Sequence, residues 1–128
     1  MNDLKKTLSK INNGVIDKIY FLKGEDQFLQ NFFIDKLSSN IFSDAQGFKK
    51  FFTTNEFSGK EIIDSILSID LFVSKKLFII KEPQKIKGKP LDELLEYCNN
   101  PSDNHFLVLI NDNFANSDSF SKKCLKIF

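Results

Sequence analysis

The sequence predicts an α/β domain with a mostly parallel sheet and helices on both faces. Apolar runs of strand length alternate along the chain with segments whose apolar residues return at helical spacing. Most of the strand-length runs are uniformly apolar, which is typical of strands buried on both faces of a sheet. This alternation indicates parallel strands joined by helices rather than a succession of hairpins.

The first part of the chain is expected to hold a helix, a strand and a second helix. Residues 3–11 carry an apolar stripe at helical spacing, and the continuous apolar run 19–22 suits a buried strand. From Gln27 the apolar residues again return at helical spacing, so they are expected to share one buried face. That face would comprise Phe28, Leu29, Phe32, Phe33 and Leu37.

The middle of the chain is expected to hold a strand, a helix and a third strand. Aromatic and β-branched residues at 48–54 favour a strand. Ser58 and Glu61 have the spacing of a capping box, which predicts a helix that continues to Ile69. Its predicted apolar stripe is Ile62, Ile63, Ile66 and Leu67. Residues 77–80 then form an apolar run of strand length.

The last part of the chain is expected to begin with a lysine-rich loop at 84–89, for which a solvated loop and a weak phosphate contact are both open. Pro90 suits the first turn of a helix. The predicted buried side of this helix is Leu91, Leu94, Leu95 and Cys98. Residues 106–110 give the clearest strand pattern, and a short helix is expected at 119–127.

The length of 128 residues indicates one domain over residues 1–128, and the composition argues against several kinds of site. The net charge is +1, so no overall field attracts nucleic acid or anionic lipid. The chain has no arginine, which removes bidentate recognition of phosphate by guanidinium groups.

Cysteine and histidine are too few for a metal site or a disulfide framework. Cys98 and Cys124 are the only cysteines and His105 is the only histidine, whereas a zinc site needs about four ligands. Neither a membrane span nor a signal-peptide pattern is present in the sequence. We therefore expect no cofactor, no metal, no membrane partner and a reduced, cytoplasmic protein.

The turn after the first predicted strand has the position of a phosphate-binding loop but not its chemistry. It contains Gly24 followed by Glu25 and Asp26, and no Gly-Lys-Ser/Thr follows. Two carboxylates at a helix N-terminus interact favourably with the helix dipole themselves and repel a phosphate. The residues therefore predict a capped helix rather than a nucleotide site.

The third predicted strand likewise lacks the carboxylate pair of a magnesium-binding strand. It ends in Lys81 and Glu82, so a lysine stands where the metal-binding aspartate would be. The remaining carboxylates show no pairing that would support acid–base chemistry. We predict that the chain neither binds nucleotide nor acts as an enzyme by itself.

Leu71 and Phe72 lie in the connection between the helix that ends near Ile69 and the strand at 77–80. Connections are usually polar because they run over the surface. Two interpretations are open: the pair fills the core from the loop, or it is exposed for another protein. The neighbouring helix and strand already supply apolar residues to the core, and this favours exposure. Lys75 and Lys76 would then rim the contact without entering it.

The ordered set of motifs resembles the N-terminal domain of the delta subunit of bacterial DNA polymerase III, a clamp-loader subunit. The matching stretches are "IYFLKGEDQFL", "FSGKEIIDSILSIDLFVSKKLFIIKE" and "LDELLEYCNNPSDNHFLVLI". The resemblance spans roughly residues 4–125. One departure is Asp70, where the family often has proline.

The resemblance implies an AAA+-like three-layer fold whose nucleotide site, at Gly24, Glu25, Asp26, Lys81 and Glu82, is degenerate. It also implies that Leu71 and Phe72 enter a pocket on the sliding clamp, the beta subunit, and favour an opened ring for loading on primed DNA. Family members are longer. The chain is therefore expected to be a fragment that lacks the last strand, the lid and the collar domain that joins the other loader subunits. Contact with DNA would be indirect or weak.

Two other classes of function stay open from the sequence. An AAA+-like nucleotide-binding domain with an unusual site would bind labelled ATP in the presence of magnesium. A nucleic-acid-binding regulatory module would show an affinity for DNA that falls steeply with salt. The clamp-binding, non-catalytic subunit of the polymerase holoenzyme is the preferred interpretation.

Overall fold

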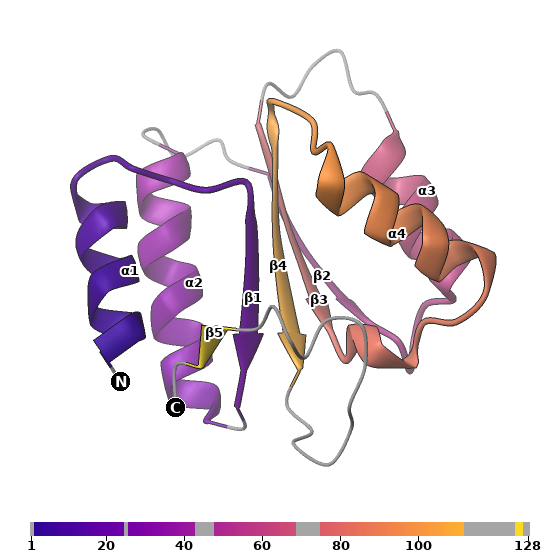
Figure 1. The fold of residues 1–128 in the computed structure, drawn as a ribbon, viewed down its shortest axis with the longest axis horizontal. Helices are drawn as coiled ribbons and strands as arrows, with labels where there is room; N and C mark the ends of the chain where they lie inside the picture. Colours follow the sequence, from indigo (N-terminus) through magenta and orange to yellow (C-terminus); the bar gives the residue numbers. More distant parts are fainter. Residues whose placement is uncertain (1, 25, 43–47, 69–74, 112–124, 127–128) are drawn as a thin grey trace.

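The computed structural model describes residues 2–24, 26–42, 48–68, 75–111 and 125–126. Within this part of the chain, helices and strands alternate as the sequence predicts (Figure 1). Every strand pair in the sheet is parallel, in the order β2-β3-β4-β1-β5. The strands are β1 (Ile19–Lys23), β2 (Phe48–Thr53), β3 (Lys76–Lys81), β4 (His105–Asn111) and β5 (Leu125–Lys126).

The helices cover both faces of the sheet, so the predicted fold class is confirmed (Figure 1). One face carries α1 (Asn2–Asn12) and α2 (Gln27–Ile41). The other face carries α3 (Gly59–Leu67) and α4 (Lys89–Asn99). A short 3₁₀ turn, η1 (Pro83–Lys85), lies in the predicted lysine-rich loop.

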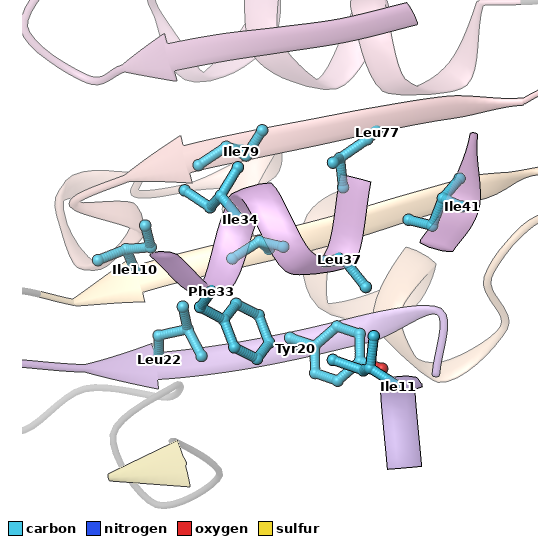
Figure 2. Packing of buried hydrophobic residues seen from close by; sticks show 11 residues of the cluster. Ile11, Tyr20, Leu22, Phe33, Ile34, Leu37, Ile41, Leu77, Ile79 and Ile110 are labelled. Carbon is cyan, nitrogen blue, oxygen red and sulfur yellow. The ribbon is translucent and has the colours of Figure 1, made fainter. Parts of the chain in front are cut away.

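The sheet separates two apolar cores. In the first, Phe33 of α2 lies beside Tyr20 and Leu22 of β1, and the rings of Tyr20 and Phe33 meet edge-on at 5.3 Å (Figure 2). In the second, Ile62, Ile63 and Ile66 of α3 and Leu94 of α4 pack on alternate residues of the same strands. Residues of β3 and β4 are buried at almost every position, as a uniformly apolar sequence predicts.

The predicted buried face of α2 is partly wrong. Phe33 and Leu37 are buried as expected, but Phe28 is 74% exposed and Phe32 is 40% exposed. Their rings stack on each other at 6.5 Å on the outer side of the helix. Apolar residues occur all around this helix, so helical spacing alone allows two stripes, and contact with the sheet selects one. The buried residues are Gln30, Phe33, Ile34, Leu37 and Ile41.

The prediction of a helix at 119–127 is wrong for the residues that the structure describes there. Leu125 and Lys126 form β5, which pairs in parallel with Leu22 and Lys23 of β1. The structure therefore has a fifth strand that the sequence analysis did not predict within residues 1–128. Hydrogen bonding to the open edge of β1 outweighs the local helical pattern, because unpaired strand edges leave donors and acceptors unsatisfied.

The capping box at the start of α3 is confirmed. The Glu61 backbone N–H donates to Ser58 Oγ at 3.2 Å, and the Ser58 backbone N–H donates to Glu61 Oε1 at 3.1 Å. Side chains thus satisfy two backbone N–H donors at this helix start.

Replacing Ser58 with alanine removes the acceptor for the Glu61 N–H, and we expect a loss of about 1 kcal/mol in the free energy of unfolding. Urea unfolding followed by circular dichroism measures the change. Ser39→Ala on the exposed side of α2 is the control, and it should be neutral or slightly stabilising because alanine favours helix. Equal losses in both variants would contradict a role for the cap.

Candidate functional site

In a parallel α/β sheet, ligands usually bind at the carboxyl ends of the strands. β4 lies between β1 and β3, so the turns that follow β1 and β3 flank the end of β4. The Gly24 N–H donates to the Asn111 carbonyl at 3.0 Å, and the Glu82 N–H donates to the Ile110 carbonyl at 2.9 Å. Both turns are therefore hydrogen-bonded to the last residues of β4.

Side chains at the start of α2 form hydrogen bonds with the backbone in and next to the turn after β1. Gln30 Nε2 donates to the Gly24 carbonyl at 2.9 Å, and Asp26 Oδ1 accepts from the Leu29 N–H at 3.2 Å. Gly24 has φ of 148°, a conformation that residues with a side chain rarely adopt. A phosphate loop needs backbone N–H groups that point at the ligand, whereas a carboxylate already occupies the N-terminus of α2. The other predicted residue of this turn, Glu25, lies outside the described residues.

At the end of β3, the side chain of Lys81 occupies the position at which a metal site would need a carboxylate. Lys81 is the last residue of the strand, and the next residue, Glu82, has the left-handed backbone conformation (φ 58°, ψ 50°). Glu82 Oε2 lies 3.0 Å from Lys85 Nζ, so this carboxylate is paired with a lysine. In the described part of the chain, no group of three or more His, Cys, Asp and Glu side chains is placed to hold a metal ion.

We expect no tight binding of ATP with magnesium, because the turn after β1 is capped by Asp26 and the end of β3 carries Lys81. Isothermal titration calorimetry at physiological salt tests this expectation. A dissociation constant below about 100 µM, or roughly −5.5 kcal/mol, would overturn it.

The segment that contains the predicted apolar pair begins and ends at described residues at the opposite end of the sheet. Leu71 and Phe72 belong to residues 69–74, which are outside the described part of the chain, so their placement stays a prediction. The two ends of this segment are described. Ser68 follows α3 and its Oγ donates to the Ser65 carbonyl at 2.8 Å. At the other end, the Lys76 N–H donates to the Asn104 carbonyl at 3.1 Å. The segment thus spans two anchored points at the amino ends of the strands.

The side chains around these anchors differ in one respect from the sequence prediction. Lys75 is exposed, as expected for a rim residue, but Lys76 is buried and its Nζ lies 5.3 Å from the centre of the Phe48 ring. The Lys76 side chain therefore packs on β2 because its stem and ammonium group find an aromatic face there. Burial, and secondarily the charge of Lys76, lower the pKa of His105 at the start of β4.

Leu67, the last residue of α3, was predicted to be buried and is 53% exposed. Ile62, Ile63 and Ile66 occupy the face that meets the sheet, and Leu67 lies one residue farther around the helix. An apolar side chain is thus exposed directly before the segment that holds Leu71 and Phe72. Helical spacing could not separate Leu67 from the core stripe, since 62, 63, 66 and 67 fit one pattern.

The family model described as "DNA polymerase III, delta subunit" matches residues 20–127. The chain belongs to this delta-subunit family. The resemblance seen in the sequence is thereby confirmed for most of the chain.

Solved structures show the same fold as this delta-family chain. A Bacillus subtilis DNA clamp loader delta protein (YqeN) has a TM-score of 0.70 at 13% identity, over 97% of this chain and 41% of that one. A Thermotoga maritima protein described as DNA polymerase III, gamma subunit-related has a TM-score of 0.61 at 11% identity, over 98% of this chain and 45% of that one. No curated protein matches significantly. The delta-family chain spans less than half the length of either solved chain.

Two features of the site were missed from the sequence. Gln30 is a buried polar residue among the apolar residues of α2, and its amide closes the turn at Gly24. The available signal was its position one turn before Phe33 and Ile34, on the face that meets the sheet. Glu82 has the left-handed backbone conformation, and no neighbouring residue in the sequence indicates this. No helix in the described part of the chain is both long and apolar enough for a membrane span.

Proposed function

We propose that this delta-family chain binds a sliding clamp through Leu71 and Phe72 and, as part of a clamp loader, favours opening of the clamp ring. The observation that carries the proposal is the family match over residues 20–127, which includes the segment between α3 and β3. Within that segment, Leu71 and Phe72 are adjacent apolar residues that follow the helix.

The described surroundings of the segment support an outward-facing pair. The core on this face already contains Ile62, Ile63 and Ile66 from α3, with Phe78 and Ile80 from β3. Hydrogen bonds of Ser68 and Lys76 anchor both ends of the segment, so a partner that binds there does not have to order the flanking residues. An apolar pair on an anchored segment is a suitable hot spot in a modest interface.

The carboxyl edge supports a role without catalysis. Asp26 caps α2, Glu82 pairs with Lys85, and Lys81 stands at the position of a metal ligand. In this proposal, ATP is hydrolysed by other loader subunits, and DNA is contacted indirectly or weakly. A role in bacterial replication places the protein in the cytoplasm.

Binding of the chain to a purified bacterial sliding clamp tests the proposal. Surface plasmon resonance with immobilised clamp should show saturable binding that does not change when ATP and magnesium are added. Absence of saturable binding, or binding that appears only with nucleotide, would contradict the proposed function.

A further inference from the structure

A pocket of about 310 Å³ lies between the end of α3 and the second half of α4. Both helices end on the side of the sheet where the next strand begins (Figure 1). The residues that line the pocket belong to these helix ends, so the pocket lies toward the amino ends of the strands. The pocket is lined by Leu67, Glu93, Glu96, Tyr97 and Asn100.

The pocket combines apolar side chains with two carboxylates. Leu67 is 53% exposed, and Tyr97 is 8% exposed and belongs to the core beneath. Glu93 is half-buried and Glu96 is exposed, and within the described residues neither forms an ion pair. The surface therefore offers an apolar wall and negative charge that no described lysine neutralises.

The position of these carboxylates is unfavourable in the isolated domain. Glu93 and Glu96 are three residues apart, so their like charges are neighbours on one helix face. Glu96 also lies in the last turn of α4, where the helix dipole favours a cation, and no basic residue is present in that turn. A cation seated between the two carboxylates would relieve both interactions.

We propose that the pocket receives a lysine or arginine side chain of the sliding clamp, next to the contact of Leu71 and Phe72. This proposal rests on the proposed function. The methylene stem of the basic side chain packs on Leu67 and Tyr97, and its charged group pairs with Glu93 and Glu96. An uncharged apolar side chain fits less well, because it would remove the carboxylates from water without a partner.

The chain connectivity indicates the clamp as the source of the cation. Leu67 lines the pocket and precedes Leu71 by four residues, a span of at most about 14 Å in extended chain. A partner that binds Leu71 is therefore held within this distance of Leu67. Charge complementarity would fix the orientation of that partner and speed its association, while the apolar pair supplies most of the affinity.

The test compares Glu93→Gln/Glu96→Gln with the wild-type chain in binding to a purified bacterial sliding clamp at several salt concentrations. We expect the affinity to fall about tenfold at low ionic strength, and the difference to shrink as salt screens the pair. Asp35→Asn/Glu56→Gln removes the same charge from exposed positions elsewhere, and it should bind like the wild type. The melting temperature of Glu93→Gln/Glu96→Gln should be unchanged or slightly higher, because the repulsion on α4 is removed.

The possible outcomes separate this inference from the proposed function. If the wild-type chain binds the clamp and Glu93→Gln/Glu96→Gln binds equally well at every salt concentration, the pocket proposal is wrong and the clamp contact stands. Equal losses in the variant and its charge control would also overturn it, since the effect would then be one of net charge. If the wild-type chain does not bind the clamp, both proposals fail.

Discussion

Replacing both Leu71 and Phe72 with alanine is expected to weaken clamp binding by about 3–5 kcal/mol, on the scale of interface hot spots. This corresponds to a roughly 10²- to 10⁴-fold higher dissociation constant. The physical reason is the loss of two apolar side chains that, in the proposal, leave water for a pocket on the clamp. Each such side chain contributes about 1.5–3 kcal/mol when it is fully buried. Surface plasmon resonance with wild-type and variant chains on one clamp surface measures the difference.

The matched control is Phe28→Ala/Phe32→Ala, which removes two exposed rings from the outer side of α2. This control should bind the clamp as the wild type does. Folding stability of the Leu71→Ala/Phe72→Ala variant should change by less than about 0.5 kcal/mol, as is usual for surface positions. If that variant unfolds, or binds at full strength, the pair belongs to the core and the proposed contact is wrong.

Replacing Phe33 with alanine is expected to lower the free energy of unfolding by about 3–5 kcal/mol. Phe33 is fully buried between α2 and the sheet, and its ring meets Tyr20 edge-on at 5.3 Å. Alanine leaves a cavity that the surrounding helices and strands cannot fill without moving. Urea unfolding followed by circular dichroism measures the loss, and the slope with denaturant shows whether unfolding stays two-state.

Phe28→Ala is the control for this measurement, because it makes the same change in the same helix at a side chain that is 74% exposed. We expect its free energy of unfolding to stay within about 0.5 kcal/mol of the wild type. Similar losses for the two variants would mean that the buried face of α2 has been assigned incorrectly.

The architecture could be predicted because its strands carry an unambiguous signal. The runs at 77–80 and 106–110 are apolar at every position, and a strand buried on both faces requires this pattern. The capping box at Ser58 and Glu61 is a local interaction, so its residues predict it without knowledge of the rest of the fold.

The sequence predictions were wrong where several local patterns fit equally well and only contacts with distant parts of the chain decide between them. Phe28 and Phe32 fit a helical stripe as well as Ile34 and Ile41 do, and only the position of the sheet selects the buried set. Leu67 is a similar case at the end of α3. The strand at Leu125–Lys126 depends on the free edge of β1, about 100 residues earlier in the chain.

For the candidate sites, the sequence was informative about residue type and less so about geometry. The residues Gly24, Asp26, Lys81 and Glu82 predict a turn without phosphate or metal chemistry, and this stays a prediction. The structure shows that Asp26 caps α2, that Gln30 donates to the Gly24 carbonyl and that Glu82 pairs with Lys85. The amide of Gln30 and the left-handed backbone of Glu82 depend on how the turns meet β4, so no local pattern indicated them. The clamp contact at Leu71 and Phe72 stays a prediction.

The separation of the interior into two cores has a consequence for how this domain can change in sequence. The cores share the strands but use alternate side chains, such as Ile79 on one side and Phe78 and Ile80 on the other. Substitutions in residues without common neighbours tend to add their effects independently. The side formed by α1 and α2 can therefore diverge extensively while the side that supports α3, α4 and the proposed partner surface keeps its packing.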